Sequence, residues 1–319
     1  MKKFVLDPAL REQLRQRSNW RGAIAVAQDW GLLFLAFGIS LAWPNPLSFL
    51  VTILLLSSVH VGFVILMHEA AHRSLFANAR ANDWVGQYLC ALPNFNNMPM
   101  YRTYHMAHHR LAGTREDPDR VMVERYPIGK ASLRRKLLRD LGGVSGIKFV
   151  IGLVGMTAGY WKFQQNGLVE RIVYPESKSL LGHIGIFVRN GGAVAVAWQL
   201  ALLGSLIALG HGLFYLFWVA AFLIPFPLFM RIRVLADHAG VHDLLSTEPI
   251  DHARSTRANW LEKLLIAPHN EHYHLEHHLV PSAPFWNLPK LHAVLEKEGV
   301  IPPANTATGM LDVLRRASI

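Results

Sequence analysis

Four long apolar segments without a single Lys or Arg constrain the fold of this chain more than any other feature. They cover residues 22–43, 46–67, 192–209 and 212–230. A helix that crosses a lipid bilayer needs ~20 predominantly apolar residues. Each segment has about this length, although Asp29 interrupts the first one. The sequence therefore predicts four transmembrane helices.

The distribution of charge predicts how these helices are oriented. Only 17% of the residues are charged, compared with about 25% in a typical soluble domain. The 32 Lys and Arg residues divide into 6 in residues 1–21, 17 in 68–189 and 9 in 231–319. The turns at Trp43–Pro46 and Gly210–Gly212 contain none. Because Lys and Arg concentrate on the cytoplasmic side of a membrane, both turns are expected to lie on the opposite side, away from the cytoplasm. This pattern explains the net charge of +10 without a nucleic-acid partner.

The predicted fold class is an all-α membrane protein with two transmembrane hairpins and a cytosolic helical cap. The expected parts are a cytosolic N-terminal segment (1–21), a membrane domain (22–300) whose cap is formed by 68–190 and 231–300, and a C-terminal tail (301–319). Residues 141–160 are apolar but rich in glycine, and we expect an interfacial or buried helix there. No cleavable signal peptide is expected, since no short apolar run with a cleavage site follows the basic start.

Three short clusters hold eight of the 17 histidines. They are His68-Glu69-Ala70-Ala71-His72, His105-Met106-Ala107-His108-His109 and His274-Leu275-Glu276-His277-His278. On a helix, residues three and four apart share a face, and neutral imidazole is a common ligand of transition metals. Eight aimed rings exceed what one tetrahedral zinc ion uses, so the clusters predict two metal ions. An even number of membrane crossings places all three clusters on the cytoplasmic side.

The first cluster also matches the H-E-x-x-H signature of zinc proteases, in which Glu69 is the general base. A membrane zinc protease is therefore a distant alternative, but it leaves the other two clusters unexplained. A metal-transport protein is a third alternative, although such proteins carry ionisable groups within their spans, and here there is little besides Asp29 and His60. His60 is expected to be a hydrogen-bonded packing residue or to line a tunnel. The isolated histidines are expected to be solvated; they are His183, His211, His242, His252 and His292.

The order of the clusters, the hairpins and the cytosolic placement resemble the membrane-bound fatty-acid desaturase and hydroxylase superfamily, over about residues 22–300. The segment Asn270–Pro281 is similar to the third histidine segment of acyl-lipid desaturases. The resemblance implies a non-haem di-iron centre in the cap, with O2 as co-substrate. It also implies a set of metal ligands, with a further histidine just after the fourth helix, for which His238 is the candidate. This set is His68, His72, His105, His108, His109, His238, His274, His277 and His278.

Four other residues are candidates for a further ligand or for an outer position around the metal. Asn270 lies four residues before His274 and is expected to approach a metal directly or through water, or else to form a turn or cap. Asp237, Glu69 and Glu276 are adjacent to cluster histidines and are expected to accept an N–H from a ligand. Salt bridging to the basic cap is an equal alternative for the two glutamates.

The resemblance implies an O2-dependent desaturase that introduces a double bond into an acyl chain of a lipid or thioester. A hydroxylase or ketolase of a lipid or carotenoid on the same irons is the alternative, because both reactions begin with the same C–H abstraction. The sequence contains one cysteine, Cys90, and no G-x-G-x-x-G motif. Electrons are therefore expected from a separate protein of the ferredoxin or cytochrome b5 type with its reductase.

Overall fold

The computed structural model describes residues 4–174 and 179–319. Residues 1–3 of the predicted N-terminal segment and residues 175–178 of the predicted cap lie outside the described residues. The described chain is mostly helical, and its two strands, β1 (Ser255–Thr256) and β2 (Thr306–Ala307), form one short parallel pair. The prediction of a predominantly α-helical chain with several membrane helices is confirmed.

The first predicted hairpin consists of α2 (Asn19–Ala42) and α3 (Pro46–Ala71), both long and apolar enough to cross a membrane. Asn45 caps α3: its side chain accepts from the backbone N–H groups of Leu47 and Ser48, and Pro46 occupies the first helical position. Such capping satisfies backbone donors that a helix start leaves free. The helix α3 ends at the first histidine cluster, as predicted.

The second hairpin differs from the prediction in its first arm. The helix α10 (Gly192–Ala208) has 17 residues, and only together with α9 (Leu180–Arg189), to which it is bent by 71°, does it reach the length of a span. At ~1.5 Å per residue, α10 alone is shorter than the ~30 Å hydrocarbon core. The structure therefore has three candidate spans, or four if the bent pair is counted as one.

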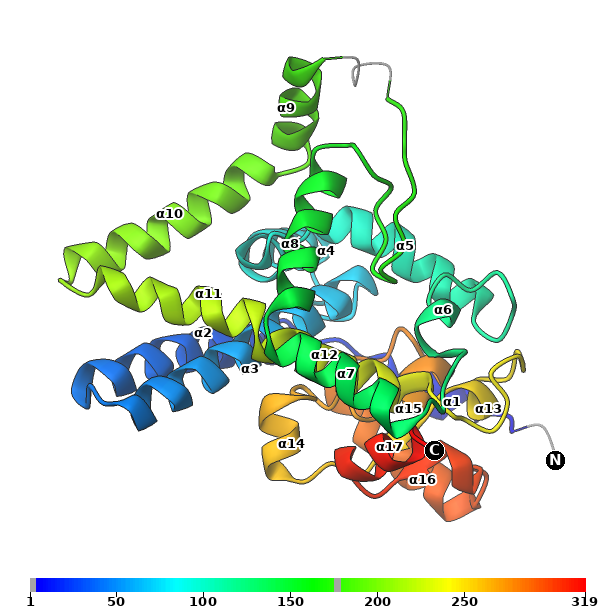
Figure 1. Ribbon diagram of the computed structural model, residues 1–319. Helices are drawn as coiled ribbons and strands as arrows, with labels where there is room; N and C mark the ends of the chain where they lie inside the picture. Colours follow the sequence, from blue (N-terminus) through cyan, green and yellow to red (C-terminus); the bar gives the residue numbers. More distant parts are fainter. Residues whose placement is uncertain (1–3, 175–178) are drawn as a thin grey trace.

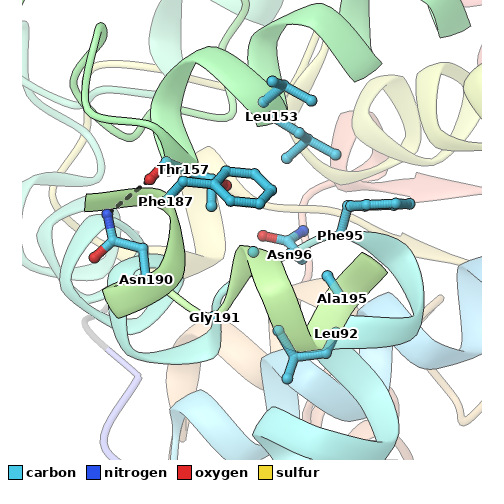
Figure 2. A pocket seen from close by; sticks show the side chains of 11 residues that line it. Leu92, Phe95, Asn96, Leu153, Thr157, Phe187, Asn190, Gly191 and Ala195 are labelled. Carbon is cyan, nitrogen blue, oxygen red and sulfur yellow. Dashed lines mark hydrogen bonds between the residues drawn. The ribbon is translucent and has the colours of Figure 1, made fainter. Parts of the chain in front are cut away.

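The bend between α9 and α10 lies at Asn190 and Gly191, and Gly191 has a φ of +85° that favours glycine. Figure 2 shows this joint beside α8 (Val144–Thr157), where the Asn190 side chain donates to the carbonyl of Thr157 at 3.0 Å. Asn97 in turn donates to the carbonyl of Asn190 at 2.8 Å. These contacts fix the direction in which α10 leaves the cap.

The second arm is longer than predicted. It comprises η3 (Gly212–Phe214), α11 (Tyr215–Leu223) and α12 (Pro225–His238), and together they form a candidate span of 27 residues. The break falls before Pro225, which has no N–H to continue the helix. The helix continues past the predicted end of the span at residue 230 to His238, and the boundary of the span itself stays a prediction. The predicted helix within 141–160 is α8, whose 14 residues are too few for a span.

The remaining helices surround the C-terminal end of α3. They are α1 (Pro8–Leu14), α4 (Ala79–Val85), η1 (Gly86–Ala91), η2 (Leu92–Asn94), α5 (Met98–Leu111), α6 (Arg120–Val123), α7 (Lys130–Leu141), α13 (Pro249–His252), α14 (Trp260–Leu265), α15 (His274–Leu279), η4 (Phe285–Asn287), α16 (Leu288–Glu298), η5 (Pro303–Asn305) and α17 (Met310–Arg316). In Figure 1 the turns of both apolar hairpins lie on the left, whereas α13, α15 and α16 lie on the right.

The helix α3 is the centre of the molecule. It contacts α2, α5, α11, α12 and α14, and from Leu56 to Ala71 all of its residues are buried. A helix that is apolar on all sides is expected in such a central position. Because neighbours enclose α3 on every side, its C-terminal end is held firmly, and that end carries the first two cluster histidines.

Candidate metal centre

The structure brings the three histidine clusters and His238 together in two adjacent groups. The first, the five-histidine group, consists of His68, His72, His105, His109 and His277, with their ligand atoms all within 4.8 Å of one another. The Nε2 atoms of neighbouring rings are 2.9–3.1 Å apart: 2.9 Å for His72 and His105, 3.0 Å for His105 and His109, 3.0 Å for His109 and His277, and 3.1 Å for His277 and His68.

The second, the four-histidine group, consists of His108, His238, His274 and His278, again within 4.8 Å of one another. Its Nε2 atoms are 3.0 Å apart for His238 and His274, 3.1 Å for His274 and His278, and 3.3 Å for His278 and His108. All four residues are buried. The nine residues are the ones predicted as ligands, and the structure places each in one of the two groups.

Helical geometry explains how two H-x-x-H-H segments serve two groups. On α5, His105 and His109 are four residues apart and point into the five-histidine group, whereas His108 points into the four-histidine group. On α15, the pattern is reversed: His274 and His278 share the four-histidine group, and His277 joins the other. Successive helical residues are ~100° apart, so adjacent histidines such as His108 and His109 face different centres.

The end of α12 is fixed by a buried arginine that the sequence did not single out. Arg254 is 1% exposed and donates to the carbonyls of Leu235 and Gly240 at 3.1 and 2.9 Å. A cation at a helix C-terminus satisfies carbonyls that have no helical partner and interacts favourably with the helix dipole. Arg254 therefore holds the last turn of α12, and with it the backbone of His238.

The rings are held in the neutral form that binds metals. Burial, together with the neighbouring His108 and His274, lowers the pKa of His72 to about 3. Burial also lowers the pKa of His105, His109 and His277 well below the usual value. A neutral imidazole offers a lone pair on one ring nitrogen, so these side chains are suited to ligation at neutral pH.

His108 is an exception among these rings because two carboxylates contact it. Burial would lower its pKa, but Asp119 and Asp117 together raise it above the usual value. Its Nδ1 donates to Asp117 Oδ1 at 2.7 Å, and Asp119 Oδ2 is 3.7 Å away. A carboxylate on the outer nitrogen directs the lone pair of Nε2 into the group, as is common for metal-bound histidines.

The donor set fits metal ions. Neutral imidazoles whose Nε2 lone pairs converge at about 3 Å repel one another unless a cation lies between them. The same separations are those expected between nitrogens bound at ~2.1 Å to one ion. The buried Nδ1 atoms of His68, His274 and His277 have no hydrogen-bond partner among the described residues. Nothing on the outer side of these three rings therefore competes with ligation through Nε2.

An acidic residue that the sequence analysis did not assign lies against both groups. Glu271, 3% exposed, has its carboxylate 4.0 Å from His68 Nδ1 and 3.4 Å from His274 Nδ1. It also forms a buried ion pair with Arg233, which is 3.7 Å from Asp237. The sequence could have indicated the contact of Glu271 with His274, which is three residues later. Only the fold shows that Glu271 also approaches His68.

The four additional candidates have different surroundings. Asp237 is 3.8 Å from His274 Nδ1, which is compatible with an outer position. Glu69 instead accepts from Ser74 Oγ at 2.8 Å and from the Phe285 N–H at 3.2 Å. Glu276 contacts Ser255 and His292. Neither glutamate contacts a cluster histidine or an arginine in these bonds, and an outer position around the metal stays a prediction for both.

Asn270 forms part of a turn. Its φ is +58°, following His269 at +54°, and its side-chain amide donates to the carbonyl of Phe285 at 3.3 Å. His269 was not predicted as a ligand, and its Nε2 lies 3.0 Å from both oxygens of Asp29. This pair explains the one acidic residue in the first predicted span. A ligand role for Asn270 stays a prediction.

The isolated histidines divide into two kinds. His60 is buried and hydrogen-bonded as predicted, with Nδ1 2.7 Å from Asn94 Oδ1. His252 and His292 were expected to be solvated, which is wrong: they are 3% and 9% exposed. His292 bonds to Glu276 at 2.6 Å, and His252 lies against the four-histidine group. Solitary position in the sequence therefore did not indicate exposure.

A cleft of about 390 Å³ lies between α7, α8 and α12. Apolar side chains line it, including Phe149 and Phe226, and Lys136 and Arg139 of α7 also lie along it. Two of its lining residues are close in sequence to histidines of the two groups: Val64 is one turn before His68 on α3, and Leu235 is three residues before His238 on α12.

Comparison with known proteins agrees with this site. The sequence profile of the family described as fatty acid desaturase matches residues 41–305. A dihydrorhizobitoxine desaturase from Bradyrhizobium elkanii is 27% identical over 280 residues, which cover 85% of this chain and 74% of the relative. A beta-carotene ketolase from Paracoccus sp. (strain N81106 / MBIC 01143) is 27% identical over 77% of this chain and 79% of the relative. A second beta-carotene ketolase, from Paracoccus sp. (strain PC1), is 26% identical over 77% of this chain and 80% of the relative.

Proposed function

The chain belongs to the fatty acid desaturase family, and from this we propose that it is an O2-dependent membrane desaturase with a di-iron centre. It introduces a double bond into an acyl chain of a lipid or of an acyl thioester. Its irons are held by the two histidine groups, one ion in each. The single observation that carries this proposal is the convergence of nine imidazoles, seven of them buried and two (His72 and His109) half-buried, into two groups.

The overall reaction balances with one O2 and one external electron pair. The substrate loses two hydrogens from adjacent carbons, and O2 takes these together with two electrons and two protons, so that two waters form. When bound, iron supplies the oxidising power that removes hydrogen from an unactivated C–H bond. The protein holds the neutral rings in place and keeps the surroundings dry, since His68, His274 and His277 are at most 4% exposed.

We assign the cleft between α7, α8 and α12 as the route of the acyl chain. Its aromatic and aliphatic lining suits an alkyl chain, and Val64 and Leu235 bring it toward both histidine groups. Lys136 and Arg139 form no ion pair among the described residues and would attract an anionic headgroup or phosphate. Arg231, by contrast, is already paired with Asp140. The substrate class is therefore an amphiphile with a negative head and an apolar chain.

The electrons come from a separate protein of the ferredoxin or cytochrome b5 type with its reductase. We place the N-terminal segment and the two histidine groups on the cytoplasmic side of the membrane, because the Lys and Arg residues avoid both hairpin turns. The cap comprises residues 68–190 and 231–300, as proposed from the sequence.

A ketolase or hydroxylase acting on a lipid or carotenoid is the second candidate. The observation that favours it is the pair of beta-carotene ketolases among the relatives, at nearly the same identity as the desaturase. Oxygen insertion begins with the same C–H abstraction and needs the same metal ligands. The shape of the cleft and the position of the substrate in it then decide the product.

The zinc protease alternative fits this geometry poorly. A protease of the H-E-x-x-H type needs Glu69 free to activate water, whereas Glu69 is bonded to Ser74 and Phe285 and is 1% exposed. His68 and His72 are also surrounded by three further imidazoles, more than a tetrahedral zinc site with a bound water requires.

Product analysis tests the proposed reaction. The purified protein, loaded with iron and supplied with O2 and a reducing system, is incubated with phospholipids, acyl thioesters, free fatty acids and β-carotene. The proposal expects a product two mass units lighter from an anionic acyl substrate. A product that gains oxygen and no double bond would favour the second candidate, and turnover of no substrate by iron-loaded protein would contradict both.

A further inference from the structure

His252 contacts two members of the four-histidine group although it belongs to none of the histidine clusters. It is the last residue of α13 and is 3% exposed. Its backbone carbonyl accepts from His238 Nδ1 at 2.8 Å, and its ring Nε2 is 3.4 Å from His278 Nδ1. One residue thus reaches two rings that come from different helices, α12 and α15.

The hydrogen bonds around His252 determine which ring nitrogens carry protons. The Ser246 carbonyl accepts from His252 Nδ1 at 2.8 Å, and a carbonyl has no proton to give. The Nε2 atom of neutral His252 therefore holds a lone pair, and His278 must donate to it from Nδ1. The Nε2 atom of His278 is then deprotonated and faces the four-histidine group. The same logic applies to His238, whose Nδ1 donates to the His252 carbonyl.

The position of His252 is fixed by the chain around it. Asn305 donates from Nδ2 to the carbonyls of Ile250 and Asp251 at 2.7 and 2.8 Å. Ser246 Oγ is bonded to Asp251 at 2.9 Å. Gly113, just after the end of α5, lies directly against Ser246: a Cβ on Gly113 would be 1.9 Å from the Ser246 carbonyl oxygen. The Ser246 carbonyl, which accepts from the His252 ring, and the chain around it are therefore held by Gly113 and Asn305, two residues far apart in the sequence.

We propose that His252 is a positioning residue of the four-histidine metal site. It keeps His278 and His238 in the tautomer that presents Nε2 to the metal. This inference rests on the proposed function, since it requires a metal in that group. His252 is not itself a ligand, because both of its ring nitrogens are directed to Ser246 and His278 rather than to the centre of the group.

Two substitutions separate this role from simple packing. His252→Phe keeps an aromatic ring of similar size but has neither the donor nor the acceptor. His252→Gln keeps both, since its amide can donate to Ser246 and accept from His278. His183→Phe is the matched control: the Nδ1 atom of His183 is likewise 2.8 Å from a backbone carbonyl, that of Ala158, but it lies outside both groups.

The readout is iron binding, measured by chelator competition and by Mössbauer spectroscopy on the full chain. Loss of an outer partner of a metal-bound histidine typically weakens binding by ~10–100-fold. We expect this loss for one of the two irons in His252→Phe, an altered signal from that iron only, and recovery in His252→Gln. His183→Phe should bind both irons as the unmodified protein does.

Thermal unfolding of the metal-free proteins distinguishes a positioning role from a structural one. The inference expects metal-free His252→Phe to unfold near the temperature of the unmodified protein. If His252→Phe fails to fold, His252→Leu replaces it, and His252→Gln still reports whether the hydrogen bonds suffice. Two irons bound with unchanged affinity in His252→Phe, or weak binding in His252→Gln as well, would overturn the inference. If the unmodified protein binds no iron, the proposed function fails instead.

Discussion

The two histidine groups share α5 and α15, but α3 contributes only to the five-histidine group and α12 only to the four-histidine group, and the two groups are supported differently on their outer sides. In the four-histidine group, His108 bonds to Asp117, His238 to the His252 carbonyl and His278 to the His252 ring. In the five-histidine group, the buried Nδ1 atoms of His68 and His277 have no hydrogen-bond partner among the described residues, and in the four-histidine group the same is true of His274 alone.

Packing takes the place of hydrogen bonds in the five-histidine group. Tyr101 stacks on His105 with ring centres 5.2 Å apart and planes 8° from parallel. His68 and His72 sit at the end of α3, which neighbouring helices enclose. The difference teaches that polar contacts orient three of the four rings in the four-histidine group, whereas the five-histidine group depends more on packing around the end of α3.

The largest expected effect comes from removing a ligand. His277→Ala takes one imidazole from the five-histidine group, and His274→Ala takes one from the other. Because the proposed reaction needs both irons, each variant should lose product formation completely and retain less iron than the unmodified protein. Product analysis and metal determination check this, with His183→Ala as the control. Full activity in either variant would show that the two groups do not act as one centre.

The second effect concerns the residue shared by both groups. Glu271→Ala removes the closer of two acidic partners from the buried Arg233, since Asp237 stays 3.7 Å away, and breaking a buried ion pair costs about 3–5 kcal/mol. We expect a loss of this size in the free energy of unfolding, together with weaker iron binding in both groups. Denaturant unfolding in detergent measures the first, and chelator competition the second.

Glu296→Ala is the control for Glu271, since it breaks an ion pair with Arg257 whose side chains are 42% and 69% exposed. Such surface pairs contribute about 0–1 kcal/mol. Equal losses of stability in Glu271→Ala and Glu296→Ala would mean that Glu271 does not hold the two groups together.

A smaller and one-sided effect is expected for Asp117→Ala. It removes the carboxylate from His108 Nδ1 and should weaken iron binding by ~10–100-fold in the four-histidine group alone. Mössbauer spectra of the partly loaded protein separate the two irons. Glu116→Ala, at the exposed neighbouring position, should leave the binding of both irons unchanged. Equal weakening of both irons by Asp117→Ala would remove the distinction between the groups.

The smallest effect is expected for Tyr101→Leu in the five-histidine group. Stacked aromatic pairs contribute about 0.5–1.5 kcal/mol beyond the area they bury. Since ~1.4 kcal/mol corresponds to a factor of ten, iron binding in this group should weaken about two- to tenfold. Chelator competition measures the change. If Tyr101→Leu weakened iron binding more than Asp117→Ala does, packing would orient His105 more strongly than the Asp117 carboxylate orients His108.

The grouping of the candidate ligands could be predicted because its signals are local. Helical spacing places His105 with His109 and His274 with His278, and charge asymmetry predicts that the distant clusters lie on one side of the membrane. Pro44 and Pro46 likewise predict the turn at Asn45. These features depend on residues that are neighbours in the chain, so the sequence alone contained them.

The outer partners of the ligands could not be predicted because they depend on how separate loops approach. His252 looked like an isolated surface histidine until the structure placed α13 against α15. Glu271 reaches His68 only because the turn at His269 and Asn270 directs it there. The predicted segment 192–209 matches α10 closely, but apolar composition does not report the 71° bend between α9 and α10.

Metal determination on the purified chain, combined with Mössbauer spectroscopy, tests the central claim most directly. The account predicts two irons per chain in two distinguishable histidine environments, both lost on chelation and both restored by iron alone. One zinc ion per chain and no bound iron after reconstitution would contradict it.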